Sequence, residues 1–343
     1  MVLLTKKRRI YKKKDNKKNK TNKKCLNPIV SVKTLKSGIK EVIVKKIMTD
    51  KEISSKEADY FDILHYKYTI TCDTDCYMVD EKGNKHLLLK FRKNVIPIHL
   101  CKIGMTNLKK AAMHKHDNRG ASAGKLDVKK LPKYANDPSR FYGKSKFRML
   151  GYYSKITNKF VNNSLGNQST SNIIGYFDKR DRNLGKNAPP CRTTAFTSQQ
   201  FDKYKKVGPL IKSIDKQFKI LIPDRYKEQY NRARQTSKFA IPGTAFSTVT
   251  INYNWRTALH KDSGDFKNGY GNLVVLEEGK YKGGETGFPQ YGVCVDVRQG
   301  DFLAMDVHEW HCNTKLIGIT KDYTRLSMVA YLRENMIKCK NMK

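Results

Sequence analysis

The sequence has few acidic residues and no long apolar segment. Asp and Glu total 31 against 69 Lys and Arg, which gives a formal net charge of +38 over 343 residues. No run of about eighteen apolar residues occurs, so we expect no segment that spans a membrane. The opening stretch MVLLTKKRRIYKKK has too short an apolar run for a signal peptide. We therefore expect an intracellular protein, nuclear or cytoplasmic.

Cysteine is also sparse for a chain of this length. Eight cysteines in 343 residues do not make the disulfide framework that stabilises small secreted domains. The sequence therefore predicts mostly reduced thiols. Cys72 and Cys76 in CDTDC have no second pair with matching spacing, so we interpret CDTDC as a turn between strands rather than a zinc site.

Basic charge is abundant both at the start of the chain and beyond it. The first 24 residues contain twelve Lys or Arg and one Asp, which is +11 and leaves +27 on the other 319 residues. Codon bias toward Lys explains the choice of Lys over Arg, but it explains the shortage of Asp and Glu less well. A folded body this basic favours a polyanionic partner, nucleic acid first. Residues 1–27 are predicted to be a disordered basic tail.

Helical and mixed segments occupy the first two thirds of the chain. Residues 28–170 are mixed, with strands predicted at EVIVKKI and HLLLKFR. The apolar residues of 201–218 recur near a period of 3.6, which predicts helix, and we expect Pro209 to divide it. Pro223 is expected at the start of a further helix.

The sequence pattern changes from residue 243 onward, where short runs typical of strands replace the helical period. STVTINY, NLVVLEEG, YGVCVDV, DFLAMDV and RLSMVAYLR are short β-branched or aromatic runs separated by turns with Gly. Strands at this spacing predict a sandwich or barrel with the preceding helices packed on one outer face. The expected fold class is therefore α+β.

An ordered set of polar residues lies in this β-rich region. His260 and Asp262 stand two positions apart, so a strand would present both on one side. Downstream, GDFLAMDVHEWHCNTKL offers His308 and His311. Two imidazoles and a carboxylate on one side of Fe(II) leave adjacent positions open for a co-substrate and O2.

A second pair follows the histidines in TRLSMVAYLR, where Arg325 and Ser327 again occupy alternate positions. A 2-oxo acid chelates iron through its keto oxygen and neighbouring carboxylate, and its distal carboxylate then requires a fixed cation. The planar fork of arginine suits that carboxylate, and a neighbouring hydroxyl adds a second donor. His-x-Asp alone arises by chance in many chains, whereas the whole ordered set is a specific signal.

The region carrying these residues resembles the TET/JBP family of Fe(II)/2-oxoglutarate dioxygenases. The resemblance covers about residues 110–335, through GTAFSTVTINYNWRTALHKDSGDF, GETGFPQYGVCVDVRQGDFLAMDVHEWHCNT and TRLSMVAYLRE, with NRGASAG and CRTTAFT upstream. It implies a double-stranded β-helix (jelly-roll) core flanked by helices, after a basic N-terminal extension. It also implies oxidation of the 5-methyl group of 5-methylcytosine or thymine in double-stranded DNA, with the base flipped out.

The resemblance also assigns a role to each residue of the motif. His260, Asp262 and His311 become the iron ligands, and His311 is chosen over His308 because WHCN matches the family pattern. The implied cofactors are Fe(II), 2-oxoglutarate and O2. Arg325 becomes the 2-oxoglutarate anchor, with Ser327 beside it. Residues 28–170 become the N-terminal, DNA-contacting part of the catalytic unit, and residues 171–343 become the helices and dioxygenase core.

Other polar and aromatic residues are candidates for substrate contact, and each also fits an ordinary structural role. Asn252 has the same strand parity as His260 and is a candidate for co-substrate contact. Asp265 and Asp178 can accept from the exocyclic amine of cytosine, where thymine offers an acceptor. The remaining candidates are Arg119 and Arg192, for a phosphate or carboxylate, and Phe246, for stacking on a base.

Two alternative functions fit parts of the same pattern. A protein prolyl or lysyl hydroxylase shares the fold, and it would release succinate in response to a peptide rather than DNA. A non-enzymatic, nucleic-acid-binding jelly roll with a basic arm would bind no stoichiometric iron and would gain no thermal protection from 2-oxoglutarate. The sequence leaves open the oligomeric state and the choice between 5-methylcytosine and thymine.

Overall fold

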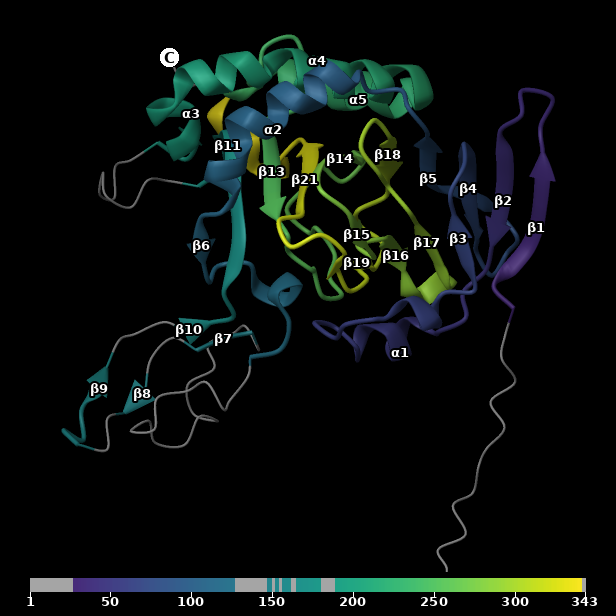
Figure 1. Cartoon of the computed structure of the whole chain (residues 1–343), viewed down its shortest axis with the longest axis horizontal. Helices are drawn as coiled ribbons and strands as arrows, with labels where there is room; N and C mark the ends of the chain where they lie inside the picture. The colour runs from purple at the N-terminus through teal and green to yellow at the C-terminus, as the bar shows by residue number, and fades with distance from the viewer. Residues whose placement is uncertain are drawn as a thin grey trace, which may run out of the picture.

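The computed structural model of the chain describes residues 27–126, 147–149, 152–153, 156–161, 165–179 and 189–340 (Figure 1). Residues 1–26 of the predicted basic tail lie outside the described residues. No helix in these ranges is long and apolar enough to cross a membrane.

Five α-helices and several short 3₁₀ helices are present in the described residues. The α-helices are α1 (Asp50–Ser54), α2 (Ile98–Ala112), α3 (Ala195–Gln199), α4 (Phe201–Leu221) and α5 (Pro223–Arg234). The 3₁₀ helices are η1 (Ile63–His65), η2 (Gly120–Ala123), η6 (Ser237–Phe239), η7 (Pro289–Tyr291) and η8 (Glu334–Cys339).

The strands of the described residues form two principal sheets. The larger, 11-stranded sheet has the order β1-β2-β4-β5-β18-β14-β21-β13-β11-β12, with β6 paired to β11. Its members are β1 (Ile29–Thr34), β2 (Lys40–Val44), β4 (Thr74–Val79), β5 (Lys85–Arg92), β6 (Lys115–His116), β11 (Ser169–Phe177), β12 (Arg192–Thr193), β13 (Thr248–Tyr253), β14 (Gly271–Glu278), β18 (Phe302–Met305) and β21 (Thr324–Tyr331).

The smaller sheet has four strands, and three further pairs are two-stranded. The four-stranded sheet runs β19 (Cys312–Asn313), β16 (Thr286–Phe288), β17 (Val293–Val295) and β3 (Tyr68–Ile70). The pairs are β10 (Leu165–Gly166) with β7 (Arg148–Met149), β15 (Tyr281–Lys282) with β20 (Ile317–Gly318), and β8 (Tyr152–Tyr153) with β9 (Phe160–Val161). The strands predicted at EVIVKKI and HLLLKFR are β2 and β5, which confirms both.

Alternation along the central strands builds a hydrophobic core on each face of the large sheet. In β14, Val274 and Leu276 enter the core shared with the helices, whereas Leu273 and Val275 enter the core shared with the small sheet. The period of two residues in a strand produces this division. The two facing sheets form a double-stranded β-helix core with helices on one outer side, so the expected α+β fold class is confirmed.

Helices α2, α4 and α5 cover that outer face (Figure 1). The prediction that Pro209 divides the helix expected at residues 201–218 is wrong, because α4 continues from Phe201 to Leu221 with Pro209 inside it. Proline removes one backbone hydrogen bond from a helix interior, but residues such as Leu210, Ile214 and Phe218 pack into the core and hold the turns together. Pro223 does begin a helix, α5, as predicted.

Strands from the first hundred residues extend both sheets. β5 pairs with β18 in the large sheet, and β3 pairs in parallel with β17 in the small sheet. Such pairings join residues more than two hundred positions apart, and local sequence patterns carry no signal for them. The boundary between residues 28–170 and 171–343 stays a prediction.

The cysteines are in two chemical states. Cys72, Cys76, Cys101, Cys294 and Cys312 are free thiols, in line with the expectation of mostly reduced cysteine. Cys191 and Cys339 are instead joined in a disulfide, which the sequence did not predict because its partners are 148 positions apart. This bond ties η8 near the C-terminus to the segment just before β12.

Candidate active site

Three of the predicted site residues converge between the two sheets. His260 and His311 form an isolated antiparallel bridge in which each backbone N–H donates to the other carbonyl at 3.0 Å. Their imidazole ring centroids lie 4.4 Å apart. Asp262 places one carboxylate oxygen 3.6 Å from His260 Nε2 and the other 3.8 Å from His311 Nε2. One ligand atom from each of the three lies within 4.8 Å of the others.

Backbone carbonyls fix which imidazole nitrogen faces this common point. His260 Nδ1 donates to the carbonyl of Ala258 at 2.8 Å, and His311 Nδ1 donates to that of Glu309 at 2.9 Å. The proton is therefore on Nδ1 in each ring, and the Nε2 lone pair points toward Asp262. Carbonyl-oriented histidines of this kind are the usual arrangement at protein metal sites. Two nitrogens and one carboxylate fit a ferrous ion with open positions.

Burial and charge set the ionisation of the three side chains. Burial, with the neighbouring His311, lowers the pKa of His260 to about 4, so its imidazole is neutral near pH 7. Burial opposes ionisation of Asp262, but the charges of His260, His311 and Arg119 outweigh it and hold the pKa of this carboxyl below its ordinary value. A neutral imidazole at His260 beside an ionised carboxylate at Asp262 suits metal binding, because ligands bind a metal ion in their deprotonated forms.

The three residues open into a cavity of about 480 Å³. Several predicted contact residues line it together with them: Asn252, Ser327, Asp265, Arg119 and Arg192. The cavity also has an aromatic and amide lining from Trp255 and Asn313. A volume of this size accommodates a small diacid and part of a nucleotide.

A hydrogen-bonded chain crosses the cavity wall from Arg119 to Ser327. Arg119 Nη2 donates to Asn252 Oδ1 at 2.7 Å, and Asn252 Nδ2 donates to Ser327 Oγ at 3.1 Å. Because Ser327 Oγ accepts this bond, its own O–H is left as a donor that can serve an anion in the cavity. Arg119 is partly buried and its Nε has no hydrogen-bond partner among the described residues. The wall therefore offers an unneutralised cation and a hydroxyl donor.

Arg325 is not among the residues that line this cavity. It is 2% exposed, its Nη2 donates to the carbonyl of Gly284 at 3.0 Å, and its Nε has no partner among the described residues. No described carboxylate lies within ion-pair distance of its guanidinium. A buried guanidinium with no counter-ion is costly unless an anion joins it, which fits the predicted role in binding a carboxylate.

A second charged cluster borders the cavity beyond the metal ligands. Arg333 Nε donates to Asp178 Oδ1 at 3.0 Å, and Arg333 Nη1 donates to Asp265 Oδ1 at 3.4 Å. Burial and the charge of Asp262 raise the pKa of Asp265 well above its usual range. Asp178 Oδ2 and Asp265 Oδ2 both lack a hydrogen-bond partner among the described residues. Asp265 lines the cavity, where a polar ligand would supply a partner for its free oxygen, whereas Asp178 is not among the lining residues.

One sequence expectation, at Phe246, differs from the structure, whereas the choice of His311 over His308 agrees with it. Phe246 is fully buried on the helix side of the large sheet, stacked on Phe218 with ring centroids 6.2 Å apart, so the predicted contact with a base is wrong. The side chain of Phe246 points toward the helices and away from the cavity. His308, the alternative to His311, hydrogen-bonds through Nε2 to the carbonyl of Phe266 at 3.1 Å and lies outside the metal group.

Sequence reasoning missed other cavity residues, namely Arg333, Tyr331 and His116. The first two continue the odd-numbered alternation that Arg325 and Ser327 begin on β21, so extending the pattern would have found them. His116 belongs to β6, whose pairing with β11 is long-range, and no local signal indicates it.

Comparison with known proteins assigns this region to a family. Residues 172–334 match the Tet_JBP model, described as the oxygenase domain of the 2OGFeDO superfamily. Thymine dioxygenase JBP1 of Trypanosoma brucei brucei is 39% identical over 170 residues, which is 49% of this chain and 20% of that protein. JBP1 of Leishmania braziliensis is 31% identical over 220 residues, 63% of this chain and 25% of that protein.

Two further similar proteins are another sequence relative and a solved structure. The bifunctional helicase and thymine dioxygenase JBP2 of Leishmania major is 32% identical over 165 residues, 48% of this chain and 14% of that protein. Among solved structures, NgTET1 in complex with 5mC DNA has a TM-score of 0.46 at 14% identity, covering 86% of this chain and 83% of that chain.

This chain thus spans between 14% and 25% of the length of these sequence relatives. The cofactors expected from the sequence, Fe(II), 2-oxoglutarate and O2, are those of the matched superfamily. Residues 172–334 of the chain are thus similar to the oxygenase domain of the TET/JBP family.

Proposed function

We propose that this chain is an Fe(II)/2-oxoglutarate-dependent dioxygenase that converts the 5-methyl group of a pyrimidine in DNA, thymine first, to 5-hydroxymethyl. The observation that carries the proposal is the convergence of His260, Asp262 and His311 in a cavity that Arg119 lines without a counter-ion, with the unpaired Arg325 almost wholly buried outside its lining.

The cofactors supply the oxidising chemistry. When bound, Fe(II) with 2-oxoglutarate and O2 provides the oxidant, and the balanced reaction inserts one oxygen atom into a methyl C–H bond while the other enters succinate with loss of CO2. The chain binds, orients and excludes water. The imidazoles and Asp262 hold the metal, while Arg325 and the hydroxyl of Ser327 bind the distal carboxylate of the diacid.

Donors at the far side of the cavity support thymine as the base. Arg333 uses Nε and Nη1 on Asp178 and Asp265, and its Nη2 has no hydrogen-bond partner among the described residues. A guanidinium N–H can donate to the O4 acceptor that thymine presents, where cytosine presents an amine. The relatives named thymine dioxygenases point to the same base.

Positive charge supports DNA as the carrier of that base. The chain has a net charge of +38, and Arg192 and Lys179 line the outer part of the cavity. Arg192 Nε has no partner among the described residues. These cations fit the phosphates beside an extruded nucleotide, since a base inside a duplex does not reach the floor of such a cavity.

The test is mass spectrometry of nucleosides after incubation with Fe(II), 2-oxoglutarate and duplex DNA. One duplex carries thymine with unmodified cytosine, and a second carries 5-methylcytosine with uracil in place of thymine. We expect 5-hydroxymethyluracil from the first and a lower yield of 5-hydroxymethylcytosine from the second. Absence of both products from iron-loaded protein would contradict the proposal, and succinate release triggered by a peptide would favour a protein hydroxylase.

A further inference from the structure

Glu277 and Arg325 face each other across the large sheet without forming an ion pair. They are directly paired in the register of β14 and β21, so their side chains leave the same face of the sheet as neighbours. Opposite charges in this position normally attract. No ion pair joins them in the described part of the chain, although Glu277 is partly buried and Arg325 almost wholly so.

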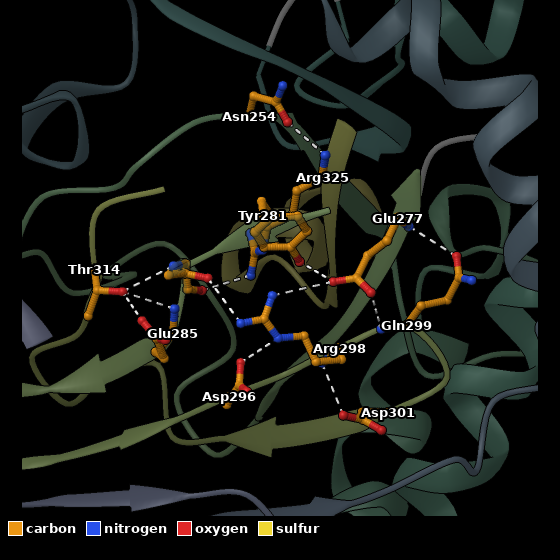
Figure 2. A network of polar contacts seen from close by, with 12 residues as sticks. Asn254, Glu277, Tyr281, Glu285, Asp296, Arg298, Gln299, Asp301, Thr314 and Arg325 are labelled. Atoms are coloured by element: carbon orange, nitrogen blue, oxygen red, sulfur yellow. Dashed lines mark hydrogen bonds and ion pairs between the residues drawn. The ribbon is translucent and has the colours of Figure 1, made fainter. Parts of the chain in front are cut away.

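The carboxylate of Glu277 is instead held by three other groups (Figure 2). The hydroxyl of Tyr281 donates to Oε1, and the backbone N–H of Gln299 donates to Oε2 at 3.1 Å. Arg298 Nη1 lies 3.8 Å from Oε1. The Glu277 carboxylate thus has partners other than its cross-strand neighbour Arg325.

Arg298 is itself fixed on several sides, as Figure 2 shows. Its Nε pairs with Asp296 Oδ1 at 2.5 Å, and its guanidinium carbon lies 4.7 Å from the ring centroid of Tyr281. Its Nη2 donates to the carbonyl of Gly283 at 3.4 Å. Arg298 therefore presents a positive charge to Glu277 from a constrained position.

The two arginines meet at one turn. Arg325 Nη2 donates to the carbonyl of Gly284, next to the carbonyl of Gly283 that accepts from Arg298. Both glycines have positive φ, and a Cβ on Gly283 would lie 1.8 Å from the carbonyl oxygen of Lys315. The two guanidiniums thus donate to consecutive carbonyls of one turn, and Glu277 has its ion pair with Arg298.

We propose that Arg298 is a positioning residue that keeps Glu277 away from Arg325, so that the Arg325 guanidinium stays available for the distal carboxylate of the co-substrate. This inference rests on the proposed function, because it assigns Arg325 to 2-oxoglutarate. Without Arg298, the cation that the strand register places directly opposite Glu277 is Arg325. An internal carboxylate on Arg325 would compete directly with the carboxylate of the diacid, and it would do so at an effective concentration that no free ligand reaches.

The experiment measures 2-oxoglutarate binding to the full chain loaded with Mn(II), by isothermal titration, for wild type and Arg298→Met. We expect the Kd of Arg298→Met for 2-oxoglutarate to rise by about tenfold or more, the scale of a hydrogen bond to a charged group. The Kd for Mn(II) should be unchanged. The KM for 2-oxoglutarate should rise in parallel, with kcat at saturating 2-oxoglutarate close to wild type.

A rescue variant separates competition from damage to the fold. Adding Glu277→Gln to Arg298→Met removes the competing charge and keeps an amide oxygen for the Gln299 N–H, so the double variant should recover most of the wild-type affinity. Lys109→Met is the matched control. It breaks the 2.6 Å pair with Glu278, the next residue of the same strand, and should leave 2-oxoglutarate binding unchanged.

The outcomes distinguish the inference from the function on which it rests. If wild type loaded with Mn(II) does not bind 2-oxoglutarate, the proposed function fails. If wild type binds and Arg298→Met binds equally well, the positioning role is overturned. If Arg298→Met binds weakly and the double variant is no better, the loss is structural and the positioning role is likewise overturned.

Discussion

The two faces of β21 carry different chemistry on adjacent residues. Leu326, Met328 and Ala330 lie at or near zero exposure in the core beneath the helices. Ser327, one position away from them, lines the polar cavity, and Arg325 leaves the same face of the sheet. The backbone pairs with β13 and β14 along the whole strand, so both faces share one scaffold.

The difference shows how a rigid core supports a reactive site. On the helix side, close packing of mostly apolar side chains stabilises the fold, and the buried carboxylate of Asp215 there is hydrogen-bonded to Tyr226 and the backbone of Ala245. On the cavity side, buried polar atoms such as Arg325 Nε and Asp265 Oδ2 lack partners, which costs stability unless a ligand supplies them. Stability and function should therefore separate between neighbouring residues, and substitutions on each face test this separation.

The largest effect is expected at the metal group. Asp262→Ala removes the only carboxylate among the three described ligand candidates and should lower turnover of methylated DNA by at least about a thousandfold. The unfolding temperature of the metal-free protein should change little. His308→Ala is the matched control, because this histidine lies outside the metal group, and it should retain activity. Equal loss in both variants would contradict the assignment.

Met328→Ala tests the opposite face. Met328 is fully buried between Ile251 and Val274 of the neighbouring strands. Its truncation should cost about 2–5 kcal/mol of unfolding free energy by leaving a cavity. Denaturant titration measures the loss, while the Kd for 2-oxoglutarate of the folded fraction should stay at the wild-type value. A large rise in that Kd with little loss of stability would contradict the separation of stability and function between the two faces of β21.

The buried His260 on the cavity side should make the unfolding free energy depend on pH. The pKa of His260 is lowered to about 4 in the folded chain, from an ordinary value near 6.5. The unfolded chain therefore takes up the proton first, so stability is full above about pH 6.5 and falls as the pH drops toward 4. The shift corresponds to at most about 3 kcal/mol.

Denaturant titration of metal-free protein with chelator present, for wild type and His260→Asn, measures this contribution. The stability difference between the two should change across that pH window. Parallel stability curves for the two proteins would contradict a buried neutral imidazole.

Ser327→Ala should give the smallest effect. In the wild type, the Ser327 hydroxyl accepts a hydrogen bond from Asn252 and can donate its own proton to the diacid. The substitution removes this hydroxyl. The expected change is a threefold to tenfold rise in the Kd for 2-oxoglutarate, about 1 kcal/mol, with Fe(II) affinity unchanged. Isothermal titration of both ligands distinguishes this from a loss of the metal site, which would weaken Fe(II) binding as well.

The fold was predictable where local patterns decide it. Alternation and β-branched residues indicated β13, β14, β18 and β21, and a 3.6-residue period indicated α4. Continuation of α4 through Pro209 was not predictable, because packing of the buried face overrides the local cost of proline. The joining of β5 to β18 depends on contacts between distant segments, which local sequence does not encode.

The candidate site divides in the same way. His260, Asp262 and His311 followed from an ordered motif and the family resemblance, and the structure brings the three together. Phe246 was misplaced because an aromatic residue near a motif carries no information about which sheet face it occupies. The pairing of Arg333 with Asp178 and Asp265 joins residues up to 155 positions apart, so only the folded chain displays it.

The central claim is that two imidazoles and one carboxylate bind a single ferrous ion. Anaerobic titration of Fe(II) into wild type, Asp262→Ala and His308→Ala, followed by calorimetry, tests it most directly. The account predicts one Fe(II) per chain in wild type and His308→Ala, and affinity reduced by at least about a hundredfold in Asp262→Ala. Wild-type protein that binds no Fe(II), or Asp262→Ala that binds it as tightly as wild type, would contradict the account.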